Sequence, residues 1–237
     1  MKILVLESSG LVASVAVVTE EKLIGEYTTN FKKTHSQTLL PMMDTLLKMI
    51  GIPVQEMDAI AVSGGPGSFT GLRIGSATAK GLGLALSIPI ISVPTVDAIA
   101  YNLCGTDAVV CPLMDARRNQ TYTGLYTFDG DQMKCISGQK AVMLGEIIDE
   151  INQLGRKVIF LGDGVPVFKP YIEEHIQVPH SYAPIHVSQQ RAGALGALAL
   201  QYYHEGKYES AAEHQPDYLR LSQAERELAA KKGQEKA

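Results

Sequence analysis

The sequence predicts an α/β protein of two similar lobes, each a sheet flanked by helices. Its 237 residues suffice for one large domain or two modest lobes. With 46% hydrophobic and 19% charged residues, the chain as a whole is too apolar to be disordered. The order strand, strand, strand, helix, strand, glycine loop occurs twice. The halves share no obvious residue identity, so the repeat is one of pattern, and it implies a cleft between two lobes.

Three short β-rich runs open the first half, separated by polar turns and spaced as antiparallel hairpins. They are residues 2–6, 11–18 and 23–29. Residues 36–50 then follow a helical period, in which Pro41 predicts a late start or a kink and Gly51 a stop. A buried strand at 58–62 leads into a glycine-rich loop.

The second half repeats this order from residue 108 onward. The expected strands are 108–114, 121–128, 133–142 and 157–161, with a helix at 145–154. Glu7 and Asp115 take equivalent places, each after the first strand of its half. An alanine- and leucine-rich helix at 188–203 should pack back on the first or the second sheet. We expect an N-terminal lobe at 1–105, a C-terminal lobe at 106–221 and a polar tail at 222–237.

Charge and cysteine content exclude several classes of protein. The 21 Lys and Arg against 25 Asp and Glu give a net charge of −4, the wrong sign for a chain that binds nucleic acid by bulk charge. The three cysteines are odd in number and lack a CxxC spacing, which favours a reduced protein without a zinc site. No apolar stretch is long enough to span a bilayer. We therefore expect a soluble, cytoplasmic protein.

The most informative segment is Ser63-Gly-Gly-Pro-Gly-Ser-Phe-Thr-Gly-Leu-Arg-Ile-Gly75. In it Gly64, Gly65 and Gly67 leave a strand and open a helix near Ser68, an arrangement that exposes backbone N–H groups to an anion such as a nucleotide phosphate. The segment is neither a Walker A motif nor a Rossmann fingerprint. The other interpretation is a tight strand-to-helix turn capped by Ser68 or Thr70, and spacing alone leaves both open.

Small residues recur every four positions along the helix that follows, at Gly71, Gly75, Ala79 and Gly83. Each interior glycine costs about 1 kcal/mol relative to alanine, so another backbone is expected to approach this ridge closely. That backbone belongs to the 36–50 helix, to another chain, or to both. The 36–50 helix is apolar on more than one face, which favours an interface between chains, whereas a helix buried on both sides within its own lobe is the alternative. The candidate interface residues are Leu39, Leu40, Met42, Met43, Leu46, Leu47, Ile50, Gly71, Leu72, Gly75, Ala79 and Gly83.

The sequence shows no evident catalytic or metal site. His35 has no histidine three to five residues later, and no other pair is spaced to bind zinc from one helix. Ser68 does not lie in a Gly-x-Ser-x-Gly elbow. Glu7, Asp115 and Asp163 could act as bases in a sugar kinase, but they fit strand-end turns equally well.

The 63–75 segment resembles the signature of the bacterial TsaB family, also called YeaZ. Agreement extends over essentially the whole chain, to Ile3–Ser9, His35–Pro41, Asp115–Asn119 and Pro216–Arg220. The resemblance implies an actin-like fold of the hexokinase and Hsp70 type, with two duplicated lobes. It also implies a candidate phosphate loop made of Glu7, Ser8, Ser9, Gly64, Gly65, Gly67 and Ser68. Many relatives have Asp at the position of Glu7, and the longer side chain argues against a magnesium-nucleotide site.

The resemblance further implies a function. TsaB proteins act with the paralogue TsaD and the ATPase TsaE, which together install threonylcarbamoyl on the adenosine next to the anticodon of tRNAs that read codons beginning with adenine. TsaB is the non-catalytic partner, paired with TsaD or with itself through helices matching 36–50 and 70–86, and it meets tRNA only through the complex. It requires no cofactor alone, and ATP or ADP at the complex interface is left open. The alternatives are a small ATP-binding enzyme of the sugar-kinase and actin superfamily, or a glycoprotease-like metallopeptidase.

Overall fold

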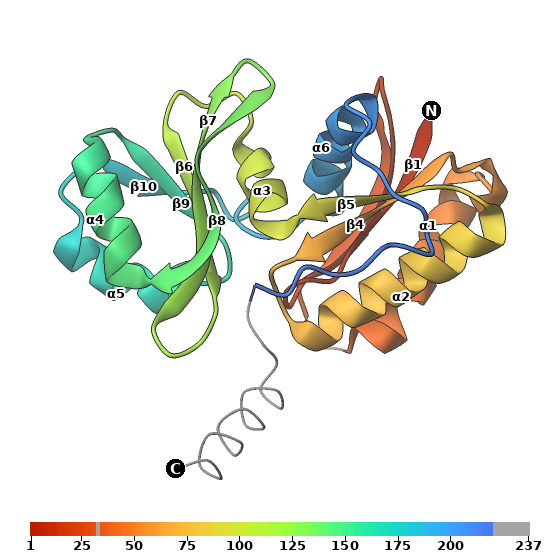
Figure 1. Cartoon of the computed structure of the whole chain (residues 1–237), viewed down its shortest axis with the longest axis horizontal. Coiled ribbons are helices and arrows are strands. Elements are labelled where there is room, and N and C mark those ends of the chain that lie inside the picture. Colours follow the sequence, from red (N-terminus) through yellow and green to blue (C-terminus); the bar gives the residue numbers. More distant parts are fainter. Residues whose placement is uncertain (32–33, 220–237) are drawn as a thin grey trace, which may run out of the picture.

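The computed structural model describes residues 1–31 and 34–219, which form two five-stranded sheets (Figure 1). The first sheet has the order β3-β2-β1-β4-β5 and the second β10-β9-β6-β7-β8. The strands of the first are β1 (Lys2–Glu7), β2 (Ala13–Thr19), β3 (Leu23–Thr29), β4 (Ala59–Gly65) and β5 (Ile90–Pro94). Those of the second are β6 (Val109–Asp115), β7 (Gln120–Asp129), β8 (Gln132–Met143), β9 (Val158–Leu161) and β10 (His180–Tyr182).

The two sheets have the same topology. In each, the first three strands form an antiparallel meander, and the first strand also pairs in parallel with the fourth, which pairs in parallel with the fifth. Glu7 ends β1 and Asp115 ends β6, so these two acids occupy equivalent positions. This duplication is the actin-like fold, and it confirms the predicted fold class.

The helices make the molecule a stack of layers (Figure 1). On one face of the first sheet lie α1 (His35–Ile50) and α2 (Phe69–Leu86), and on its other face lie α3 (Thr95–Ala100) and α6 (Ala192–His204). On the far side of the second sheet lie α4 (Leu144–Leu154) and α5 (Val165–His175). The short helix α3 also packs on the near face of the second sheet, so it lies between the sheets. Helix α6 returns to the first sheet after the second lobe is complete.

Several elements differ from the expected ones. Helix α1 runs through Pro41 from His35, so it does not start late. Sequence patterns missed β5, α3, α5 and β10, which are short or, in α5, contain proline. The predicted tail at 222–237 lies outside the described residues. Within the part of the chain that the structure describes, no helix is both long and apolar enough to cross a membrane.

A partly buried carboxylate joins the lobes. The Tyr126 hydroxyl of β7 donates to Oδ1 of Asp97 on α3 at 2.6 Å, and the Tyr202 hydroxyl of α6 donates to Oδ2 at 3.3 Å. Burial raises the pKa of Asp97, while both tyrosine hydrogen bonds oppose that shift. One side chain therefore binds elements of both lobes.

Candidate functional site

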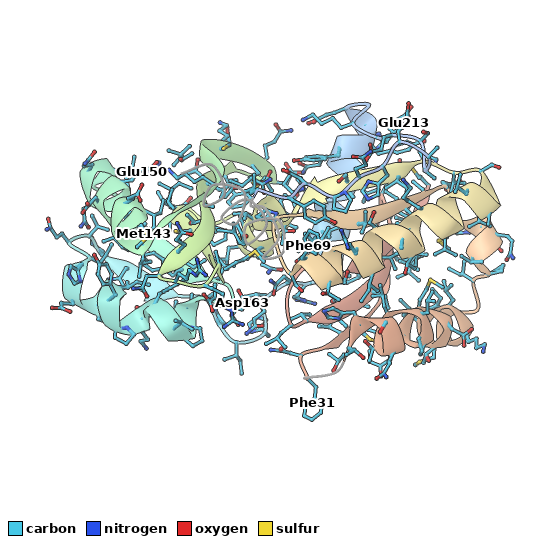
Figure 2. The ribbon with its side chains drawn as sticks, turned by 60° about the horizontal axis from the view of Figure 1, so that its bottom comes forward. Phe31, Phe69, Met143, Glu150, Asp163 and Glu213 are labelled. Atoms are coloured by element: carbon cyan, nitrogen blue, oxygen red, sulfur yellow. The ribbon has the colours of Figure 1, made fainter. Side chains whose placement is uncertain are left out.

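The cleft between the lobes holds a cavity of about 340 Å³. Its first-lobe wall is the turn after β1, at Ser9 and Gly10, together with Ser68 at the start of α2. Asp115 and Asp163 form part of the opposite wall, and Figure 2 shows Asp163 between the lobes. The duplicated fold thus brings together candidate residues that are more than one hundred positions apart in the sequence.

Glu7 lies beneath the turn that follows β1, and its carboxylate is hydrogen-bonded to other residues of the chain. It is fully buried, and both the backbone N–H and the hydroxyl of Ser9 donate to its Oε1 at 2.6 Å. Burial raises the pKa of Glu7, and the Ser9 hydrogen bonds act in the opposite direction. The Ser8 N–H points to the Ser63 hydroxyl at 3.4 Å. These donors of the predicted phosphate loop are engaged by the protein itself.

The glycine loop is closed in a similar way. The Ser68 N–H donates to the Ser9 carbonyl at 2.6 Å, and the Ser68 hydroxyl accepts from Gly71 as the cap of α2. A Cβ on Gly67 would collide with the Ser9 backbone, and one on Gly65 with the Asp217 carbonyl. The third loop glycine, Gly64, packs against Ser92. The structure has the capped turn, with Ser68 as the cap and the glycines packed closely against other parts of the chain. Phosphate binding by this loop stays a prediction.

The opposite wall contains a strained turn. Arg117, Arg118 and Asn119 have φ angles of 66°, 56° and 59°, a left-handed run that costs roughly 1–2 kcal/mol per non-glycine residue. The Arg117 N–H donates to Asp115 Oδ1 at 2.8 Å, and its guanidinium lies 3.3 Å from Oδ2 of the same side chain. The turn therefore holds a cation against Asp115 at the edge of the cleft.

Asp163 faces this ion pair. Its Oδ1 is buried and has no hydrogen-bond partner among the described residues. Burial, reinforced by the charge of Asp115, raises the pKa of Asp163 to about 6. Across the described ranges, no three His, Cys, Asp or Glu side chains come close enough together to hold a metal ion.

The small-residue ridge of α2 faces inward, contrary to the expectation of an intermolecular contact. A Cβ on Gly71 would collide with the backbone carbonyl of Ser8, just after β1, and one on Gly75 with the Ser8 hydroxyl. A Cβ on Gly83 would lie 2.8 Å from the Cβ of Ala211. Ala79 is fully buried in the core of the first lobe. The approaching backbone therefore belongs to the chain itself, because four-residue spacing shows that a ridge is bare but not which neighbour it meets.

Most of the predicted interface residues are core residues as well. Those that are buried are Leu39, Met42, Leu46, Leu47 and Leu72. Met43 and Ile50 are partly buried against the same core. Leu40 differs from them, because 49% of its side chain is exposed on the outer face of α1.

A second ridge of small side chains, not predicted from the sequence, runs along the outer face of α2. It is made of Ala77, Gly81 and Ala85, which are all exposed. A Cβ on Gly81 would meet nothing within 4 Å. We call these three residues the outer ridge. Its residues also recur every four positions, but the neighbouring ridge of three glycines and an alanine is the more evident pattern in the sequence.

These features define a two-lobed, actin-like protein in which the turns after β1 and β4 are hydrogen-bonded to each other, and whose first lobe has exposed small side chains along α2. Residues 22–228 match the family model described as TsaD, tRNA N6-adenosine threonylcarbamoyltransferase. The chain is 34% identical to the tRNA threonylcarbamoyladenosine biosynthesis protein TsaB of Bacillus subtilis, over 95% of this chain and 96% of that protein. It is 29% identical to the TsaB of Escherichia coli, over 98% and 100%. The chain therefore belongs to the TsaB family.

The structure of YeaZ from Pseudomonas aeruginosa superimposes with a TM-score of 0.76. The match has 26% sequence identity and covers 92% of this chain and 99% of that one. The likeness thus includes both lobes, and it agrees with the resemblance that the sequence motifs indicated.

Proposed function

We propose that this chain is the non-catalytic scaffold subunit of a cytoplasmic complex that installs threonylcarbamoyl on tRNA. Its relatives carry the name of tRNA threonylcarbamoyladenosine biosynthesis proteins, and the matched family model carries the name of the transferase. In this proposal a TsaD-type subunit supplies catalysis, TsaE completes the complex, and tRNA binds through the assembly. The chain itself requires no cofactor, and any ATP or ADP binds at the interface with the TsaD-type subunit.

The observation that carries the proposal is the outer ridge. Helix pairs pack most closely where one ridge has small side chains, and Gly81 at the centre of this ridge has open space around it. Leu40 on the neighbouring helix α1 adds an exposed apolar side chain. Together they offer a docking layer for a helix pair of a paralogue, or of a second copy of this chain as a homodimer.

Two observations support the absence of catalysis by this chain. In the turns that would hold a nucleotide phosphate, the Ser9 N–H donates to Glu7 and the Ser68 N–H donates to the Ser9 carbonyl. The lobes, which must move in an enzyme that closes on its substrate, are joined through Asp97. A net charge of −4 also makes the chain a poor primary tRNA ligand.

The test is a threonylcarbamoyl-transfer assay with TsaD, TsaE and this chain, in which each component is omitted in turn. We expect no transfer and no ATP turnover by this chain alone, and loss of transfer when it is left out. ATP turnover by the chain alone that disappears on Glu7→Ala or Asp115→Ala would establish the kinase or ATPase alternative in place of the scaffold.

A further inference from the structure

A second cavity lies beside the connection that returns from the second lobe to α6. Its volume is about 640 Å³, and it shares no lining residue with the interlobe cleft. One wall comes from the first lobe, with Glu26 and Thr28 of β3. The other wall is the connection itself, from Ile185 to Arg191. Any molecule in this cavity therefore touches both a sheet edge and the link between the lobes.

Gln190 lines this cavity and is the most unusual side chain in it. Only 2% of the residue is exposed, yet neither atom of its carboxamide has a hydrogen-bond partner among the described residues. The carboxamide is packed against Gly10, where a Cβ would collide with its Nε2. Buried amides are almost always satisfied, because an unpaired one loses its bonds to water without replacement. The carboxamide therefore lacks a partner that the cavity has room to supply.

The surrounding polar groups indicate what kind of partner is missing. The Glu26 carboxylate already accepts from the Arg191 guanidinium, from the Gly193 N–H at 3.1 Å and from the Thr28 hydroxyl at 3.2 Å. The carbonyl oxygens of Gln189 accept from Asn30 and Asn102. These acceptors are in use.

Donors, in contrast, remain available. Arg191 has five N–H donors and uses one nitrogen on Glu26, and about a third of its side chain is exposed. His186 has no hydrogen-bond partner in the described part of the chain, and the Gln190 carboxamide leaves its Nε2 donor and its Oε1 acceptor unpaired. Water bonds each of these donors singly, whereas one group with two acceptor oxygens bonds several of them at once. An acceptor-rich, planar group uses the surplus, and arginine binds carboxylates through two parallel hydrogen bonds.

We propose that this cavity binds a small aliphatic carboxylate, either as a free metabolite or as the C-terminal carboxylate of a peptide. The carboxylate oxygens accept from the Arg191 guanidinium and from the Nε2 of Gln190. Arg191 pairs with Glu26 through one nitrogen, and its other N–H groups are left for the ligand. Val12 and Ile185, the latter 95% exposed, contact the aliphatic part.

The first experiment titrates the full chain, labelled with nitrogen-15, with butyrate and with its neutral analogue butyramide. We expect saturable shifts of the 185–191 and β3 amide signals, with butyramide binding at least about tenfold more weakly. A tripeptide ending in valine, as free acid or as amide, distinguishes the two sources: tighter binding of the acid than of butyrate indicates a peptide terminus, and equal or weaker binding a metabolite. Absence of saturable shifts with all carboxylates, or equal affinity for butyramide, would overturn the proposal.

Variants separate the site from general stability. Gln190→Leu replaces the unpaired carboxamide by an apolar side chain, so it should raise the melting temperature while weakening butyrate binding about tenfold. Gln132→Leu, at the exposed start of β8, is the matched control and should leave binding unchanged. His186→Ala, at an exposed position, should weaken binding severalfold and serves if Gln190→Leu folds poorly. Undiminished binding in Gln190→Leu, or in His186→Ala where that variant has to serve, contradicts the site.

Discussion

Asp163, which lines the cleft, makes the free energy of unfolding depend on pH. Its pKa is raised to about 6 from an ordinary value of 3.8, chiefly by burial. Between these two values the folded chain keeps a proton that the unfolded chain has released, so the free energy of unfolding falls as pH rises through this window. Above it, the buried charge destabilises the protein by about 3 kcal/mol.

We therefore predict that Asp163→Asn becomes progressively more stable than the unsubstituted chain as pH rises from about 4 to about 7. Urea unfolding at a series of pH values measures the difference. Asp149→Asn, at an exposed position of α4, controls for the loss of one negative charge. If the stability curves of Asp163→Asn and the unsubstituted chain run parallel, Asp163 is not the group that titrates.

For single residues, the sequence predicted where a capping or acidic side chain lies better than it predicted the contacts which that side chain makes. The capping role of Ser68 and the acids at Glu7 and Asp115 follow from turn chemistry and strand ends, and the structure has them at those places. The Ser9 bonds to Glu7 could not be predicted, because they depend on a two-residue turn whose geometry the neighbouring loop fixes. The left-handed run at Arg117 also has no sequence signal, since none of its residues is glycine.

Helix α2 has two ridges of small residues with opposite environments. Gly75 faces Ser8, whereas Gly81 faces open space. Spacing predicted the helix and its bare ridge, but not the direction of that ridge, because the same four-residue period occurs on both faces. Substitutions meant to block an interface must therefore be placed on the outer ridge, since Gly75→Leu would overpack the core.

One substitution made at both glycines should have effects of opposite sign. Gly81→Ala should stabilise the protein by about 1 kcal/mol, because alanine is the better helix former and its methyl group meets nothing. Gly75→Ala should destabilise it by about 1–3 kcal/mol, because its methyl group displaces the buried Ser8 hydroxyl from its hydrogen bond to the Gly71 carbonyl. Thermal unfolding of both variants measures the effects, and a stable Gly75→Ala would show that the ridge is not closely packed.

For the molecule as a whole, the duplicated topology was predictable and the relation between the lobes was not. The repeated order of elements follows from hydrophobic periods and turn residues. The lobes are joined by the hydrogen bonds of Asp97 with Tyr126 and Tyr202, which we call the interlobe lock. Asp97 and Tyr202 are more than one hundred residues apart, and the three residues follow no motif. The short α3 that carries Asp97 was itself missed, because six residues are too few to show a period.

The interlobe lock can be tested by removing one tyrosine hydroxyl at a time. Tyr126→Phe should lower the free energy of unfolding by about 1–3 kcal/mol, because it leaves the partly buried carboxylate of Asp97 with one donor fewer. Tyr202→Phe should cost less, since its hydrogen bond is longer, at 3.3 Å. Chemical unfolding measures both, and small-angle scattering should show wider separation of the lobes in Tyr126→Phe. Unchanged stability and scattering would mean that Asp97 does not hold the lobes together.

In the proposed complex the outer face of α2 binds a paralogous catalytic subunit, and the mass of the particles in solution measures whether this binding occurs. Light scattering after size-exclusion chromatography would compare the chain, Gly81→Ala and Gly81→Leu, each mixed with TsaD. We predict a heteromer with the chain and with Gly81→Ala, and separate components with Gly81→Leu, even though that variant folds and is at least as stable. A heteromer of undiminished amount with Gly81→Leu would contradict the account.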